Sequence, residues 1–99
     1  MAASSFHEFY PEYLAEHRDP TCRRLHFAGS ALVLLASGTA AVKHDWRWLL
    51  AAPFAGYGLA WIGHFFFEHN RPATFRRPLY SLAGDWVMFR DILIGKIAL

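Results

Sequence analysis

The sequence predicts an all-α fold, a small helical membrane protein with a transmembrane hairpin flanked by an N-terminal amphipathic helix and a C-terminal interfacial helix. Two observations predict it. Residues 25–42 contain no Lys, Arg, Asp or Glu, and a second uncharged run covers residues 48–67 after a short polar break. Each run is about as long as the shortest helix that crosses a bilayer core. We therefore expect two spans, at about residues 25–42 and 46–67, in a single membrane-embedded domain of residues 1–99.

Composition narrows the class of protein. The 99 residues are 55% hydrophobic and 18% charged, which excludes a disordered chain. Two buried helices of a soluble bundle would be the alternative to a hairpin, but so short a chain cannot cover two helices that are apolar on all sides. The net charge is +2 and the basic residues form no single block, so nucleic acid is not an expected partner.

The basic residues also predict an orientation. Eight of the ten Lys and Arg lie outside the hairpin ends, and only Lys43 and Arg47 lie in the turn. By the positive-inside rule both termini then face the cytoplasm. Trp46 and Trp48 beside the turn suit the membrane–water interface on the side opposite the cytoplasm. The N-terminal residues carry several acids and no apolar core with a cleavage site, so we expect no signal peptide.

The N-terminal helix is expected to begin after Ser5, which forms a capping box with Glu8. Aromatic residues then recur at helical intervals, and His17 falls on their side. Pro11 offers an alternative start for this helix.

The helix that enters the membrane is expected to begin at Asp19-Pro20, as an N-cap followed by proline at the first helical position. After the hairpin, Arg71-Pro72 and Arg77-Pro78 interrupt regular structure. Ser81 to Gly84 can then cap a last helix from about Asp85 to the C-terminus, which we expect to lie at the membrane interface.

Histidines are the candidate metal ligands. On the second span a face of small residues leads to a histidine and a carboxylate in four-residue steps, and a similar face lies on the first span. The first set is Gly56, Ala60, His64 and Glu68, and the second is His26, Ser30, Ser37 and Ala41. A tight hairpin brings His26 beside His64 and Glu68, and His17 reaches the same level.

Three imidazoles and a carboxylate suit zinc, iron, nickel or copper, and an iron(II) site with open positions is what oxygen-activating enzymes need. The spacing does not choose among these metals. Alternatively, each of these residues is simply a hydrogen-bonded polar group at a helix end.

The remaining candidates rank lower. His7 and His44 are not expected to be ligands, because one is on the acidic side of its helix and the other is in the hairpin turn. His69 is a reserve ligand, about 140° around the helix from His64. The single cysteine, Cys22, excludes a disulfide within the chain and a Cys-based zinc site, and we expect it to be a small buried side chain.

Several motifs together resemble a known family. They are Phe9-Tyr10-x-x-Tyr13-x-x-x-His17, Arg23-x-x-His26-x-x-Gly29 and Gly63-His64-x-x-x-Glu68-x-Asn70-x-Pro72-Ala73-Thr74. The set resembles the 2-hydroxy fatty acid dioxygenases named for the metabolism of phytosphingosine to odd-numbered fatty acids, in their short bacterial branch. The resemblance covers about residues 6–90.

The resemblance implies an integral membrane enzyme of the bacterial inner membrane. It would use iron(II) and dioxygen to shorten a 2-hydroxy fatty acid by one carbon through α-oxidation. Carried over by position, the metal ligands are His17, His26 and His64. Glu68 is implied as a catalytic residue, either a further ligand or a partner of one.

Two further roles complete the hypothesis. Arg71, Arg76 and Arg77 follow the second span and could draw in the substrate's carboxylate, although such residues commonly set topology and contact lipid phosphate. The acyl chain could lie among Phe65–Phe67 and the last helix. The rival hypothesis is a non-enzymatic membrane protein, either a helical scaffold or a haem carrier that uses His26 and His64.

Overall fold

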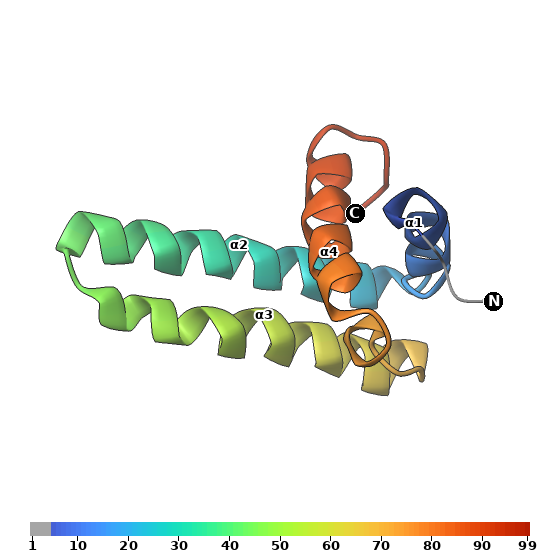
Figure 1. Cartoon of the computed structure of the whole chain (residues 1–99), viewed down its shortest axis with the longest axis horizontal. Helices are drawn as coiled ribbons and strands as arrows, with labels where there is room; N and C mark the ends of the chain where they lie inside the picture. Colours follow the sequence, from blue (N-terminus) through green and yellow to red (C-terminus); the bar gives the residue numbers. More distant parts are fainter. Residues whose placement is uncertain (1–4) are drawn as a thin grey trace.

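The described residues form four α-helices and contain no strand (Figure 1). The structure is a computed structural model that describes residues 5–99. Helix α2 (Pro20–Lys43) and helix α3 (Ala51–Ile62) form a long antiparallel hairpin. Helix α1 (Phe6–Ala15) lies at the end of the hairpin opposite its turn, and helix α4 (Pro78–Leu93) crosses α2 near the same end. The expected all-α fold is confirmed.

Three short helical segments complete the part of the chain that the structure describes. A 3₁₀ segment (η1, Trp46–Leu50) leads from the turn into α3, and a π-helical segment (η2, Gly63–Glu68) ends the second arm of the hairpin. A 3₁₀ turn (η3, Ala73–Phe75) precedes α4. The second arm is therefore a succession of three helix types over the expected span.

Both arms are long and apolar enough to cross a membrane, over Pro20–Lys43 and Trp46–Glu68. These ranges contain the expected spans. Only 22% of the most apolar stretch of the first arm and 17% of that of the second are buried inside the protein. Helices at the core of a soluble protein bury most of their residues, whereas the apolar side chains here mostly face outward.

The helix starts follow the expected caps. The hydroxyl of Ser5 accepts a hydrogen bond from the Glu8 N–H at 3.3 Å, and Oδ1 of Asp19 accepts from the Thr21 N–H at 2.8 Å. The alternative start at Pro11 is wrong. Pro11 lies inside α1, because the cap at Ser5 has already begun the helix one turn and a half earlier.

The expected start of the last helix is also wrong. Helix α4 begins at Pro78 rather than near Asp85, because proline at the first helical position has its φ already set for a helix and needs no N–H partner. Ser81 and Gly84 lie inside the helix and serve in packing. A Cβ at Gly84 would come within 3.1 Å of the Tyr13 ring, so glycine lets α4 approach α1. The helix ends at Leu93, before the C-terminus.

Near the middle of the hairpin the two arms come close together where glycine faces glycine. A Cβ at Gly29 would lie 3.2 Å from the carbonyl oxygen of Gly56. The expected face of the second arm is confirmed at Ala60, which is buried. On α2, His26 of the expected packing face is buried, but Ala41 of the same face is exposed. Gly29 provides the close contact instead.

Helix α1 is held on α4 by a small aromatic core. Phe9, Tyr13, Ala73 and Met88 are each 1% exposed and form one buried cluster. Burial of a side chain as large as Phe9 or Met88 contributes about 1.5–3 kcal/mol. This packing fixes the end of α1, from which the chain passes through His17 into α2.

Candidate metal centre

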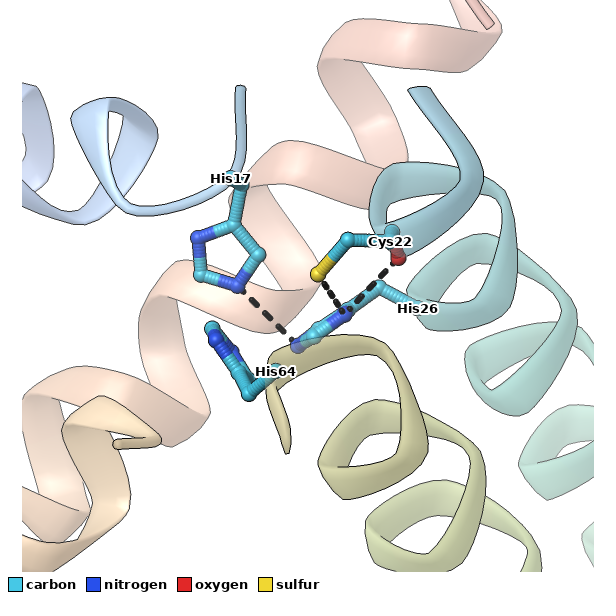
Figure 2. A group of neighbouring side chains, drawn as sticks. All are labelled: His17, Cys22, His26 and His64. Atoms are coloured by element: carbon cyan, nitrogen blue, oxygen red, sulfur yellow. Dashed lines mark hydrogen bonds between the residues drawn. The ribbon is translucent and has the colours of Figure 1, made fainter. Parts of the chain in front are cut away.

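Three chain segments deliver one histidine each to a common point (Figure 2). His17 follows α1, His26 is on the second turn of α2, and His64 is in the π-helical segment that ends the second arm. The ring centroids of His17 and His26 are 4.3 Å apart, those of His17 and His64 4.5 Å, and those of His26 and His64 4.9 Å. The three residues singled out in the sequence therefore meet in the structure.

The cluster is sealed from solvent. His17 and His64 are 1% exposed and His26 is 5% exposed. Burial is the main reason why the pKa of His17 is lowered to about 2, with a further contribution from the neighbouring His26. The ring is thus neutral at ordinary pH, and neutral imidazole is the form that binds metals.

Each of the three rings has an oxygen partner at Nδ1. Nδ1 of His17 is 2.6 Å from the Tyr13 carbonyl oxygen, and Nδ1 of His26 is 3.1 Å from the Cys22 carbonyl oxygen. A carbonyl oxygen only accepts hydrogen bonds, so both Nδ1 atoms carry the proton. The Nε2 atoms of both neutral rings are then bare acceptors.

The same holds for His64, whose Nδ1 is 2.6 Å from Oδ1 of Asn70. The amide of Asn70 is oriented by its Nδ2, which donates to the Glu16 carbonyl oxygen at 3.2 Å. Its Oδ1 must therefore face His64 and accept the proton of Nδ1. Ligating histidines in metal sites show this arrangement, with one ring nitrogen fixed by an oxygen and the other left for the metal.

The spacing of the bare nitrogens is the clearest sign of a cation site. Nε2 of His17 and Nε2 of His26 lie 3.0 Å apart, although neither carries a proton to share. Two lone pairs at this distance repel unless a positive charge lies between them. In a tetrahedral site with bonds of about 2.0–2.1 Å, two nitrogens are separated by roughly 3.4 Å. The observed contact is close to that value, so the residues fit a metal ion.

A π-helical segment places His64. Its six residues, Gly63–Glu68, have one extra residue in the turn, and such segments often occur at functional sites. His64 remains buried while the following phenylalanines are exposed. The segment ends at His69, which adopts a left-handed conformation with φ of 58°, and the Asn70 N–H then donates to the His64 carbonyl oxygen. This return of the chain brings the Asn70 side chain to the imidazole.

Cys22 is the residue that sequence reasoning did not place in the site. Candidate ligand atoms of His17, Cys22, His26 and His64 all lie within 4.8 Å of one another. The sulfur of Cys22 is 3.8 Å from Nδ1 of His26, on the ring nitrogen turned away from His17 (Figure 2). The signal was the four-residue spacing of Cys22 and His26, which puts both on one face of α2. The expectation of a small buried side chain is confirmed.

Glu68 lies outside this four-residue cluster of the described chain. Its carboxylate accepts a hydrogen bond from the backbone N–H of Asp19, which joins the end of the second arm to the start of the first. Of the other histidines, His7, His44 and His69 are all exposed. His44 ends α2 in a left-handed conformation. It therefore lies at the hairpin turn, at the opposite end of the hairpin from the cluster.

The three arginines surround the loop before α4. Arg76 forms an ion pair with Glu16, with Nη1 2.8 Å from the carboxylate oxygen. The guanidinium of Arg71 lies 5.2 Å from the centroid of the Phe75 ring, and that of Arg77 lies 5.8 Å from the centroid of Tyr80. All three are at the same end of the hairpin as the histidines.

One further ionisable pair borders the cluster. The Tyr13 ring is stacked on His17 with centroids 4.1 Å apart, and its hydroxyl donates to the carboxylate of Asp85 on α4. Burial raises the pKa of Tyr13 well above its usual value, and burial also raises the pKa of Asp85 to about 6, against the opposing effect of the Tyr13 hydrogen bond.

Fold and site together define a class: small all-helical proteins with an apolar hairpin and a buried cluster of three histidines at one end. The family described as 2-hydroxy-palmitic acid dioxygenase Mpo1-like matches residues 3–97, and the chain belongs to it. This confirms the resemblance found in the motifs. No curated protein and no solved structure gives a match.

Proposed function

We propose that the protein is an iron(II)-dependent dioxygenase that removes one carbon from a 2-hydroxy fatty acid by α-oxidation. The observation that carries the proposal is the common orientation of the three imidazoles, each with Nδ1 bound to an oxygen and Nε2 left for a metal. The name of the family supplies the substrate class and the type of reaction. His17, His26 and His64 are the proposed ligands.

The choice of metal follows from the reaction. Three neutral imidazoles suit both zinc and iron. Zinc has no redox chemistry, however, and a dioxygenase needs a metal that can exchange electrons with dioxygen. Iron(II) held by the three histidines would supply that redox chemistry. The overall reaction needs no other reductant, because one 2-hydroxy acid and one O2 give an acid one carbon shorter, CO2 and water.

The surrounding residues would prepare the site rather than react. Tyr13, Cys22 and Asn70 hold the three Nδ1–H groups, so the Nε2 atoms stay unprotonated and keep their directions. Burial excludes bulk water and so protects reactive species from side reactions. Glu68 would act as a positioning residue through its hydrogen bond to Asp19, which ties the segments of His17 and His64 together.

The three arginines would concentrate the substrate. Their positive charge, at the same end of the hairpin as the histidines, would attract a carboxylate headgroup at the membrane surface, over a range of about 8–10 Å at physiological salt. Because Arg76 is paired with Glu16, its contribution would be smaller than that of Arg71.

We also propose that the two arms cross the bacterial inner membrane with both termini in the cytoplasm. The outward-facing apolar arms support insertion, and the distribution of basic residues supports this orientation. Reporter fusions that are active on only one side of the membrane test it. A reporter at the C-terminus should be active in the cytoplasm, and one inserted after His44 should be active outside.

A haem carrier is less well supported. The rings of His26 and His64 contact each other with centroids 4.9 Å apart, and His17 adjoins both. The two axial ligands of a haem lie on opposite sides of its flat ring. Imidazoles that contact each other in this way leave no space for that ring between them. A Soret band in the purified protein would reverse this conclusion.

The test compares two triple variants. The protein is purified without oxygen, loaded with iron(II) and given 2-hydroxypalmitic acid, while oxygen uptake and the C15 acid are measured. Asparagine at His17, His26 and His64 should abolish both iron binding and turnover. The matched control carries asparagine at the exposed His7, His44 and His69, since asparagine tolerates the left-handed backbone of the last two.

Two results would reject the proposal in different ways. Full iron content in the first triple variant would show that these histidines are not the site. Intact iron binding in the parent protein without oxygen uptake would remove the dioxygenase activity and leave a metal-binding membrane protein.

A further inference from the structure

A cavity of about 170 Å³ adjoins the histidine cluster. His26 forms part of its wall, together with Ser30 and Val33 of α2, Gly56 and Ala60 of α3, and Asp85 of α4. An engineered protein cavity of about 150 Å³ accepts a benzene molecule, so this volume holds roughly six carbon atoms. The cavity therefore offers room for a small apolar group directly beside one of the proposed ligands.

The wall is apolar away from the histidine. Val33, Pro53 and Ala60 contribute aliphatic surface, and Gly56 contributes space, since a Cβ there would lie 3.1 Å from Cγ2 of Val33. The carboxyl of Asp85 is held by the Tyr13 hydroxyl at the side of the cavity nearest α1. The cavity thus has a polar part near the cluster and an apolar part along the hairpin.

The cavity opens to an apolar surface rather than to water. Tyr57 and Leu82 both line it and are 36% and 45% exposed, so they form its rim. Tyr57 lies on an arm that is long and apolar enough to cross a membrane, and Leu82 lies on the helix that crosses α2 (Figure 1). With the two arms inserted as proposed above, a molecule that enters past these side chains comes from the lipid.

We propose that this cavity binds the carboxyl-proximal carbons of a free fatty acid, with its carboxyl end at the histidine cluster and its tail leaving between Tyr57 and Leu82 into the bilayer. The proposal rests on the fatty acid substrate proposed above and adds where the chain lies and how it enters. We take a free fatty acid rather than a phospholipid as the occupant, because a glycerophosphate headgroup would have to share a cavity of only about 170 Å³ with the acyl carbons. Phe65–Phe67 are exposed and do not line this cavity, whereas Leu82 and Trp86 of the last helix do.

Binding is tested apart from turnover by fluorescence. Trp86 lines the cavity, and a nitroxide near it quenches its emission. The protein is placed in phosphatidylcholine nanodiscs, with and without iron(II), and titrated with 5-doxyl-stearic acid. The part of the quenching that is lost in Trp86→Phe reports binding in the cavity. Added 2-hydroxypalmitic acid should displace the labelled acid and so remove this quenching.

The key variant is Ala60→Leu, which fills the cavity from a buried position. It should weaken the affinity for 5-doxyl-stearic acid, measured by the displaceable quenching, at least tenfold, with iron and without it. Ala28→Leu is the matched control, since Ala28 is exposed on α2 and does not line the cavity, and it should bind within twofold of the parent. If Ala60→Leu does not fold, as judged by circular dichroism, Val33→Phe fills the same space.

The outcomes separate this proposal from the proposed function. Quenching in a folded cavity-filling variant equal to that of the parent overturns the cavity assignment. Quenching that 2-hydroxypalmitic acid fails to displace also overturns it, as does the absence of Trp86 quenching because phosphatidylcholine chains hold the cavity. None of these outcomes contradicts the proposed dioxygenase activity. Displaceable binding that Ala60→Leu removes supports the assignment even where the parent protein shows no oxygen uptake.

Discussion

Gly63 lies against Cys22 so closely that a Cβ on the glycine would be 2.9 Å from Sγ and 3.1 Å from Cα of the cysteine. This contact presses the start of the π-helical segment onto the first turn of α2. It joins the residue before His64 to the residue one turn before His26. The spacing of the two histidines therefore depends on the absence of a side chain at position 63.

Gly63→Ala should separate the two arms at the site. Because the nearest atoms include backbone of α2, the strain cannot be relieved by a side-chain rotation, and overpacking of this kind costs about 1–3 kcal/mol. The midpoint of thermal unfolding and the iron content should both fall. Gly58→Ala is the control, since a Cβ there meets nothing within 4 Å and alanine favours a helix by about 0.5–1 kcal/mol. Equal effects of the two changes would contradict the role of the contact.

The glycine pair in the middle of the hairpin gives a second prediction. Gly29→Ala places a Cβ 3.2 Å from the Gly56 carbonyl oxygen, and backbone on both sides must move apart. We expect a loss of about 1–2 kcal/mol of unfolding free energy, measured by denaturant titration in detergent. Gly38→Ala, where a Cβ meets nothing within 4 Å, should not destabilise the protein. A stable Gly29→Ala variant would show that the arms are not in close contact at this point.

Asn70 should affect the metal without touching it. Asn70→Ala removes the acceptor for Nδ1 of His64 and leaves the ring free to rotate or to change tautomer. Loss of such a partner typically weakens metal affinity 10–100-fold. Competition with a chelator measures this affinity. Asn70→Asp should recover most of it, because a carboxylate accepts the same proton, whereas a purely structural role of Asn70 would give both variants the same affinity.

Asp85 should make the stability of the metal-free protein depend on pH. Its pKa is raised from 3.8 to about 6 in the folded protein, so between these values the folded state binds more protons than the unfolded state. The free energy of unfolding should therefore fall as pH rises from about 4 to about 6, by roughly 3 kcal/mol at most, and then level off.

Asp85→Asn should abolish that fall, since asparagine still accepts from the Tyr13 hydroxyl and never ionises. The variant should exceed the parent in unfolding temperature at pH 7.5 and approach it at pH 4. Thermal unfolding with a chelator present measures the difference. A constant difference across this pH range would show that Asp85 does not titrate as inferred.

Local sequence signals predicted the helices and the identity of the three histidines. The caps at Ser5 and Asp19 and the two uncharged runs act within a few residues, so they can be recognised without the fold. They placed His26 and His64 at the same end of a hairpin. The start of α4 was missed because its early residues, Ser81 and Gly84, suit a cap as well as they suit packing against α1.

Only the tertiary structure decided the chemistry of the cluster. The partner of His64 is oriented by Glu16, 54 residues away from Asn70, and Tyr13 reaches Asp85 across 72 residues. Such contacts depend on how α1 and α4 pack on the hairpin, and no helical periodicity encodes them. The sequence by itself determined which imidazoles can meet, since helix length and turn position fix their level. The packed chain determined which nitrogen of each ring faces its neighbours, because that depends on oxygen atoms brought in from other segments.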